Sequence, residues 1–334
     1  MKSRKLGPFD VSSIGLGCMS LSPAYGPPPG EVHGRELLHR ALDVGYNFLD
    51  TASVYGIGGN ETLIGESLKE RRAEFTLASK CGLGPNAEGR RELNGRPEAI
   101  KWSCEQSLKR LQTDVIDLFY LHRLDRKVPI EESAGALGDL VKEGKVRTVG
   151  LSEVSAATLR RAHAEFPITA LQTEYSLWTR NPEVAVLEAC RELGVAFVAF
   201  SPVARGFLTN SELAPDQFAE TDIRYNMPRF QGAAWEANLR LLEGFKAVAG
   251  RVGCTAAQLS LAWVLAQGDH IVPIPGTGKI AHLEENAEAD QVELTSEMME
   301  ELAILINPTT VTGPRYSPAM QASIDTEEII PEER

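Results

Sequence analysis

The sequence predicts a single α/β domain over residues 1–334, a (β/α)8 barrel, or TIM barrel. Three observations predict this fold class. The length suits one barrel of eight β/α units. Eight short apolar segments alternate with longer amphipathic segments, as expected for parallel strands connected by helices. A glycine-rich segment follows the last apolar one, where barrels of this type commonly bind phosphate.

Most of the predicted strands are short and apolar at successive positions, which is typical of strands buried on both faces of a parallel sheet. They are expected at Ile14–Met19, Asn47–Asp50, Phe75–Lys80, Val115–His122, Val146–Ser152, Ala170–Glu174, Ala196–Ser201 and Ile271–Pro275. Up to the seventh strand, successive strand starts are about 20 to 40 residues apart, the length of one βα unit.

Helical patterns occupy the segments between the strands. Leu37, Ala41 and Val44 share one face of the first helix, and Pro97 and Pro129 stand at tolerated helix starts. Later helices are expected to begin near Ser155, Pro182 and Thr255.

Three segments fall outside the eight units. A two-stranded hairpin with Gly7 and Pro8 near its turn is expected before the barrel. The stretch from Leu208 to Gln231 is polar and rich in Pro and Gly, which predicts a long loop over the site. The tail from Asn307 to Arg334 has little periodicity.

The placement of glycines favours a closed barrel over an open, doubly wound sheet. An open dinucleotide-binding fold carries GxGxxG after its first strand. The first strand here leads to Gly15-Leu-Gly17-Cys-Met-Ser20, which lacks the third glycine. The nearest match, Gly276-Thr-Gly278-Lys-Ile-Ala281, follows the last strand, and no further strand completes an open unit.

Composition excludes several classes of function. The net charge of −12 argues against nucleic-acid binding, which needs a surplus of Lys and Arg. No apolar run approaches the roughly 20 residues of a membrane span, and no signal peptide is recognisable. Five widely spaced cysteines without a CxxC pair predict free thiols and a cytoplasmic setting. The histidines show no metal-ligand spacing, so no metal is expected. No pattern predicts an oligomeric state.

Ionisable side chains end three of the predicted strands. Asp50, Lys80 and His122 each follow an apolar run, and Tyr55 stands five residues after Asp50. Strands of a parallel barrel end at the same face, where catalytic residues of such barrels lie. Buried charges are costly unless paired, so three at one face indicate a function rather than packing.

The chemistry of these four residues suggests a tuned proton donor. A phenol has a reference pKa of about 10, and a nearby ammonium stabilises the phenolate. A carboxylate keeps the ammonium charged, and an imidazole can hydrogen-bond a carbonyl oxygen. Such a donor suits carbonyl reduction, in which negative charge develops on oxygen. Because no side chain supplies hydride, a cofactor is expected.

Several motifs are shared with one known family. They are Asp50-Thr-Ala-Ser-Val-Tyr55-Gly56 with Asn60-Glu61, Lys80, Leu121-His122, Gly150-Leu-Ser152, Gln172 to Trp178, Ser201-Pro202, and Ile274-Pro275-Gly276 with Leu283-Glu-Glu285-Asn286. On these motifs the sequence resembles the aldo-keto reductases over nearly its whole length. It is most similar to a bacterial, plant and fungal NADP-dependent branch with Gly-Leu-Ser-Glu and Pro228-Arg229-Phe230. The resemblance implies that Asp50, Tyr55, Lys80 and His122 are the catalytic tetrad and that Tyr55 is the acid.

The resemblance also implies a nicotinamide site, in which Ser152 and Gln172 hydrogen-bond the carboxamide and Tyr175 stacks on the ring. Glu153 stands where many relatives carry Asn, and a carboxylate cannot donate to the carboxamide oxygen. It is therefore not assigned to this site.

The loops after the last two strands are expected to hold the rest of the cofactor. Small residues after the seventh strand would let backbone amides approach a pyrophosphate, with charge from Arg205; the alternative is an ordinary turn with a solvated arginine. The residues expected to bind the cofactor in these two loops are Ser201, Val203, Arg205, Gly206, Leu208, Gly276, Thr277, Lys279, His282, Glu285 and Asn286.

The preferred cofactor is NADPH, with NADH as an alternative. Many relatives hold the 2′-phosphate with a basic residue at the Gly276 position and Arg at the His282 position, and both are absent here. Lys279 and His282 are expected to compensate.

The substrate is expected to be a small carbonyl compound in a pocket lined by Tyr25, Val54 and Trp178, although Trp178 also suits ordinary packing. Arg229 could meet an anionic group or be solvated.

Two other functions fit less well. One is a redox-sensing regulatory protein that binds the cofactor with little turnover. Such a protein would be expected to carry a long extension for docking to its partner, and none is seen in this sequence. A lyase or isomerase using Lys80 as a Schiff base would not need Asp50 and Tyr55 at these spacings.

Overall fold

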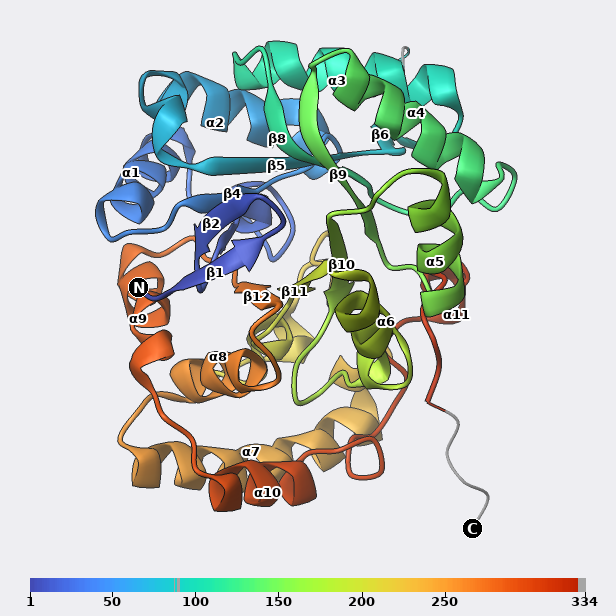
Figure 1. The fold of residues 1–334 in the computed structure, drawn as a ribbon. Coiled ribbons are helices and arrows are strands. Elements are labelled where there is room, and N and C mark those ends of the chain that lie inside the picture. The colour runs from blue at the N-terminus through green and yellow to red at the C-terminus, as the bar shows by residue number, and fades with distance from the viewer. Residues whose placement is uncertain (87, 89–90, 330–334) are drawn as a thin grey trace.

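Eight parallel strands form the central sheet of the computed structural model, which describes residues 1–86, 88 and 91–329 (Figure 1). They are β3 (Leu16–Gly17), β4 (Phe48–Asp50), β5 (Thr76–Cys81), β8 (Ile116–Leu121), β9 (Val146–Ser152), β10 (Ala170–Glu174), β11 (Ala196–Phe200) and β12 (Ile271–Ile274). Each strand pairs with the next one in this series. All eight coincide with predicted strands to within a few residues at each end, so this part of the fold prediction is confirmed.

The two outer strands of this series meet and close the barrel. Gly15 N–H donates to the Pro273 carbonyl at 2.9 Å, and Gly17 N–H donates to the Pro275 carbonyl at 3.1 Å. A Cβ at Gly17 would lie 2.7 Å from the Ile274 carbonyl oxygen, so only glycine allows this approach. The sheet is therefore a closed (β/α)8 barrel.

Helices surround the barrel (Figure 1). The α-helices are α1 (Glu31–Asp43), α2 (Gly59–Leu68), α3 (Pro97–Leu111), α4 (Ile130–Lys142), α5 (Ala156–Glu165), α6 (Val186–Leu193), α7 (Gly232–Val252), α8 (Ala256–Ala266), α9 (Ile280–Ala287), α10 (Ser296–Leu305) and α11 (Pro318–Gln321). Short 3-10 helices are η1 (Cys18–Leu21), η2 (Tyr55–Gly58), η3 (Lys69–Glu74), η4 (Asn181–Glu183), η5 (Ala204–Gly206), η6 (Pro215–Gln217), η7 (Pro228–Phe230) and η8 (Ala289–Gln291).

Side-chain caps mark two of the predicted helix starts. Ser155 accepts a hydrogen bond from Thr158 N–H at the start of α5, and Thr255 forms a capping box with Gln258 at the start of α8. Pro182 lies in the short η4 instead, and α6 starts only at Val186.

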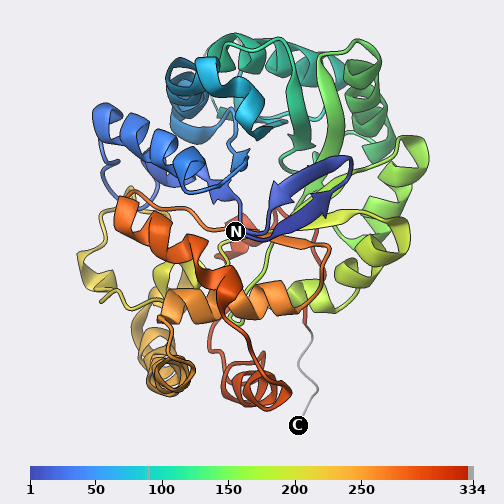
Figure 2. The same cartoon turned by 60° about the vertical axis from the view of Figure 1, so that its left-hand side comes forward.

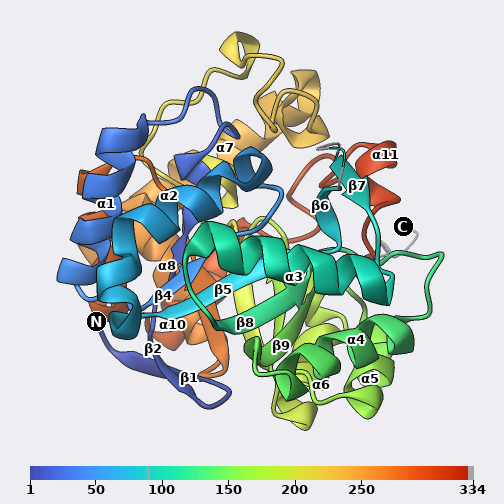
Figure 3. The ribbon, with the colours of Figure 1, turned by 90° about the horizontal axis from the view of Figure 1, so that it is seen from above.

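The predicted N-terminal hairpin is present and plugs one end of the barrel. β1 (Ser3–Leu6) pairs antiparallel with β2 (Phe9–Ser12), and Gly7 in the turn has a φ of +58°. Leu6 and Val11 are fully buried in the cluster of side chains inside the barrel. Figures 2 and 3 show the hairpin across the end of the barrel opposite α11.

The other face is built from loops (Figure 3). A second hairpin, β6 (Leu83–Pro85) with β7 (Arg91–Leu93), was not predicted from the sequence. The tail folds back onto the barrel, where Asp325 N–H donates to the Glu153 carbonyl at 3.0 Å. This face therefore carries the predicted loop between Leu208 and Gln231, parts of which line the cavity described below, and also the tail, whose position was not predicted.

Among the described residues, no single helix is both long enough and apolar enough to cross a membrane. The pair α7–α8, bent by 84°, meets both criteria only when the two helices are taken together. Ten of the residues of α8, Ala256 to Leu265, are buried in the protein.

Candidate active site

The four predicted catalytic residues meet at the loop-bearing face. Lys80, on β5, is fully buried, and its Nζ donates to Asp50 Oδ1 at the end of β4. The same nitrogen donates to the Thr51 carbonyl at 2.8 Å and to the Tyr55 hydroxyl at 3.4 Å. His122 directly follows β8, and its ring lies edge-on to that of Tyr55 with 5.9 Å between centroids. The Lys80 ammonium thus forms hydrogen bonds with both the Asp50 carboxylate and the Tyr55 phenol.

Opposing effects set the protonation of the phenol. Burial raises the pKa of Tyr55, and the Lys80 ammonium counteracts this rise. Burial also opposes the charge of Lys80, but Asp50 and Tyr55 outweigh it and raise the pKa of Lys80 above its ordinary value. Lys80 therefore stays an ammonium. A Schiff-base lysine needs a lowered pKa and access to the substrate, so this environment argues against the lyase alternative.

His122 is neutral at ordinary pH. Burial lowers its pKa well below 6.5, and the nearby charges of Arg123 and Lys80 lower it further. Its Nδ1 is buried and has no hydrogen-bond partner among the described residues. The neutral imidazole can therefore donate one hydrogen bond from its ring N–H to a carbonyl oxygen without carrying a charge.

A cavity of about 1030 Å³ opens beside the tetrad. Asp50, Tyr55 and His122 line it at one place. The other predicted site residues that line it are Tyr25, Val54, Ser152, Gln172, Ser201, Val203, Arg205, Gly206, Gly276, Thr277, Lys279, His282, Glu285 and Asn286. The structure thus brings together most of the predicted cofactor and substrate residues.

The cavity fits a dinucleotide. Its volume is at the upper end of ordinary ligand sites, which leaves room for a cofactor and a small substrate. At its far end, a Cβ on Gly276 would lie 2.8 Å from the Gly17 carbonyl oxygen and 2.9 Å from Ser20 Oγ. A basic side chain at position 276 would therefore collide with the barrel closure. The exposed Lys279 and the half-buried His282 are the remaining basic groups at this end.

Backbone strain is concentrated around the cavity. Glu153, Ser201, Ala204 and Arg205 have φ between +50° and +57°, in the left-handed region that disfavours non-glycine residues. These residues follow the strands β9 and β11 at their carboxyl ends. Such conformations persist only where the surroundings hold them, and they cluster at functional sites.

Besides the fully buried Lys80, three predicted site residues do not line the cavity. Tyr175 lies 5.8 Å from Phe197 and 5.4 Å from Trp263 between ring centroids, and its hydroxyl donates to Glu183 at 2.8 Å. Leu208 is fully buried, and Trp178 stacks on Phe207 at 4.2 Å.

The expectation that Tyr175 stacks on the nicotinamide is not met by this arrangement. Side chains alternate between the two faces of a strand, so Gln172 on β10 points inward while Tyr175 packs outside the barrel. Phe200, at the end of β11, is the aromatic residue that lines the cavity there. The sequence offers an aromatic residue near the end of each of two neighbouring strands, Tyr175 and Phe200. It does not show where these strands end, so it could not predict which of the two lines the cavity.

Arg205 and Arg229 also differ from expectation. Arg205 lines the cavity, but its guanidinium donates to Glu174 at 2.5 Å and to the Tyr316 hydroxyl at 2.9 Å. Arg229 is neither solvated nor at the cavity, since it donates to the Gly313 carbonyl at 3.0 Å. Burial lowers the pKa of Arg229 to about 10.

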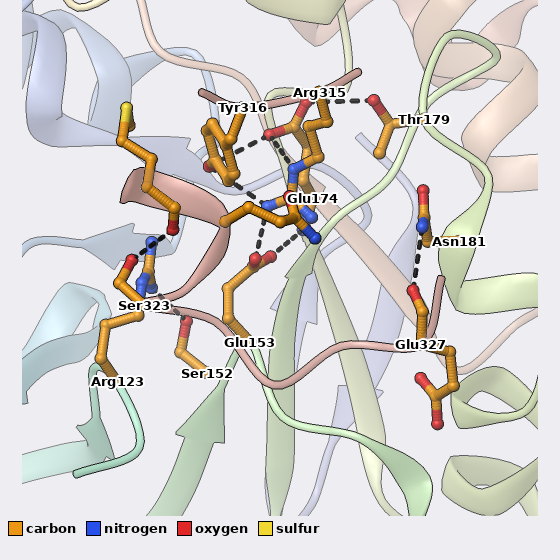
Figure 4. Close-up of polar contacts among 12 residues, drawn as sticks. Arg123, Ser152, Glu153, Glu174, Thr179, Asn181, Arg315, Tyr316, Ser323 and Glu327 are labelled. Atoms are coloured by element: carbon orange, nitrogen blue, oxygen red, sulfur yellow. Dashed lines mark hydrogen bonds and ion pairs between the residues drawn. The ribbon is translucent and has the colours of Figure 1, made fainter. Parts of the chain in front are cut away.

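A buried cluster of charges that the sequence did not predict anchors the tail (Figure 4). Arg315 donates to Glu153 and, at 3.0 Å, to Glu174, which also holds Arg205. Burial opposes ionisation of Glu174, but Arg205 and Arg315 outweigh it and lower the pKa of this carboxyl to about 2. Glu153 thus points to the tail instead of the cavity, and Tyr316 is brought to the cavity wall.

Comparisons with known proteins agree with this geometry. The model of the aldo/keto reductase family matches residues 13–307. A curated relative, aldo-keto reductase yakc [NADP(+)] of Schizosaccharomyces pombe, is 43% identical over 328 residues, which cover 96% of each chain.

Solved structures are similar over the same length. Glycerol dehydrogenase AKR11B4 from Gluconobacter oxydans is 28% identical with a TM-score of 0.84, covering 95% of this chain and 98% of that one. An aldo/keto reductase from Klebsiella pneumoniae, solved with NADP and acetate, is 26% identical with a TM-score of 0.73 and covers 95% and 99%. With its closed barrel, its tetrad and this family match, the chain belongs to the aldo/keto reductase family.

Proposed function

We propose that this protein reduces aldehydes or ketones to alcohols with NADPH and that Tyr55 donates the proton. One observation carries the proposal: Lys80 Nζ contacts both Asp50 and the Tyr55 hydroxyl at the edge of a cavity large enough for a dinucleotide. Family membership supports carbonyl reduction over the regulatory alternative.

Each residue of the tetrad has a distinct part in the proposed reaction. The neutral His122 and the Tyr55 hydroxyl bind the carbonyl oxygen and orient it. When bound, the dinucleotide supplies the hydride to the carbonyl carbon. As negative charge grows on the oxygen, Tyr55 transfers its proton to it, and the Lys80 ammonium stabilises the phenolate left behind. Asp50 keeps Lys80 charged and in place.

The cofactor would lie along the cavity from the tetrad to the start of α9. Ser152 and Gln172 line its inner part, and Gln172 also donates to Asp50 Oδ2 at 2.7 Å, which couples cofactor binding to the tetrad. Lys279 and His282 are the basic residues for a 2′-phosphate. The name of the yeast relative includes NADP(+), and the Klebsiella structure contains NADP, which supports NADPH over NADH.

Steady-state absorbance of the reduced nicotinamide tests the proposal, with NADPH and NADH each offered against a panel of aldehydes. We expect turnover with NADPH. Lys279→Gln should weaken NADPH binding by about tenfold, the value of one charge-assisted contact, and leave NADH binding unchanged. Tight cofactor binding without turnover of any carbonyl would contradict the proposed reaction, and equal losses for both cofactors would contradict the role of Lys279.

The cytoplasmic location is also part of the proposal. All five cysteines are free thiols, four of them buried, which is typical of proteins in a reducing compartment. Fractionation of cells with an antibody against the protein would test it, and recovery outside the cytoplasm would contradict it.

A further inference from the structure

Arg123 stands beside the tetrad and has no part in the reaction described so far. It follows His122 at the end of β8, is half-buried and lines the cavity. Its Nη1 donates to the His122 carbonyl at 2.7 Å and to Ser152 Oγ at 3.3 Å. Figure 4 shows the guanidinium lying between Ser152 and the tail residue Ser323. These contacts hold the side chain in the wall of the cavity.

Arg123 differs in its partners from Arg205 and Arg224, which also line the cavity. Arg205 is paired with Glu174 at 2.5 Å, and Arg224 is paired with Asp222 at 2.7 Å. Over the described part of the chain, Arg123 has no carboxylate partner within 4.0 Å, and its Nε and Nη2 have no hydrogen-bond acceptor. One edge of the guanidinium is therefore available to a ligand.

The charge around this edge is positive although the whole protein is acidic. Arg91, on β7, lines the same cavity, and no carboxylate among the described residues pairs with it. Both arginines are close enough to His122 to lower its pKa, and Arg123 also acts on the pKa of Tyr55. In a chain of net charge −12, two unpaired arginines at the catalytic end would attract an anion there.

We propose that Arg123 forms an anion subsite next to the tetrad, and that the physiological substrate is a carbonyl compound carrying a carboxylate near its carbonyl group. A guanidinium binds a carboxylate through two parallel hydrogen bonds, which fixes the orientation of the substrate as well as adding affinity. Arg91 adds long-range attraction. This inference rests on the proposed carbonyl reduction and names the substrate class for the same site.

Matched probes test the subsite. We would measure kcat/KM with NADPH for 2-, 3- and 4-formylbenzoate and for the methyl ester of each. The acids are anionic at pH 7, whereas the esters have the same carbonyl and no charge. Variants are Arg123→Leu, Arg123→Lys and, as a control with equal loss of charge, Arg147→Leu. Arg147 is exposed at the start of β9, where it pairs with Asp117 at 3.0 Å.

For at least one isomer, we expect the wild type to prefer the acid over its ester. Arg123→Leu should reduce this preference by about 10- to 100-fold, the effect of losing a charged hydrogen bond. Arg123→Lys should retain part of it, and Arg147→Leu should leave it unchanged. The ratio of kcat/KM for the acid to kcat/KM for the ester is insensitive to general damage through Ser152 or the fold, because such damage slows the reduction of both probes equally.

Two results would overturn the subsite. One is a wild type that reduces the esters at least as well as all three acids; the other is an acid-to-ester ratio in Arg123→Leu within twofold of wild type. Failure of the wild type to reduce any acid or ester would instead contradict the proposed carbonyl reduction itself, and the subsite with it.

Discussion

The buried charges that anchor the tail give a quantitative prediction about stability. Arg315 is 8% exposed, and its contacts Glu153 and Glu174 are 0% and 3% exposed. In Arg315→Leu, Glu174 keeps Arg205, whereas Glu153 loses the one cationic partner that it has among the described residues. Removing one member of a buried ion pair leaves an uncompensated charge and costs about 3–5 kcal/mol. We expect the free energy of unfolding of Arg315→Leu to fall by this amount.

A double-mutant cycle isolates the cause. Glu153→Gln removes the stranded charge, so Glu153→Gln with Arg315→Leu should be more stable than Arg315→Leu alone. Urea unfolding followed by circular dichroism gives each free energy from the midpoint and slope. Arg251→Leu is the matched control, because Arg251 forms an equally close pair with Glu301 on the surface, where such pairs contribute about 0–1 kcal/mol. The reasoning is refuted if Arg315→Leu costs no more than Arg251→Leu.

Three further predictions concern the tetrad and the barrel closure. Lys80→Met removes the charge that offsets burial of the phenol, so kcat/KM should fall by about 10²- to 10⁴-fold in the aldehyde assay; retention of activity within tenfold would argue against the ammonium. His122 resists protonation when folded but not when unfolded, so the protein should lose about 1 kcal/mol of stability between pH 6.5 and 5.5, and His122→Asn should lose less, as measured by denaturant midpoints. Gly276→Ala places a methyl against the Gly17 carbonyl and should cost about 1–3 kcal/mol in urea unfolding, whereas Gly250→Ala, which meets nothing within 4 Å, should not destabilise the protein; equal stability of the two variants would contradict the close approach.

The barrel was predictable because its strands have a strong local signal. A strand covered on both faces needs apolar residues at successive positions, and β11 and the part of β8 from Leu118 onward show this directly in the sequence. The tetrad was predictable for a related reason. An ionisable residue that ends such a run, like Asp50 or Lys80, contrasts sharply with the residues before it.

The loop-bearing face was less predictable because its contacts join distant segments. Arg315 and Glu153 are 162 residues apart, and neither lies in a pattern that identifies its partner. The hairpin β6–β7 is short and its strand β7 is exposed, so it lacks the alternation that marks a strand. Either Tyr175 or Phe200 could have reached the cavity. The outcome depends on where β10 and β11 end and on which side chains point into the barrel, and the sequence pattern alone determines neither of these.

Single-turnover absorbance of NADPH in Tyr55→Phe, with saturating aldehyde, tests the central claim most directly. The exposed Tyr225, which does not line the cavity, gives the control Tyr225→Phe with the same chemical change. We predict that hydride transfer slows by at least about 10²-fold in Tyr55→Phe, because proton donation from a positioned acid contributes that much, while NADPH affinity and the rate of Tyr225→Phe stay near wild type. Hydride transfer in Tyr55→Phe within a few-fold of wild type would contradict the role of Tyr55 as the proton donor.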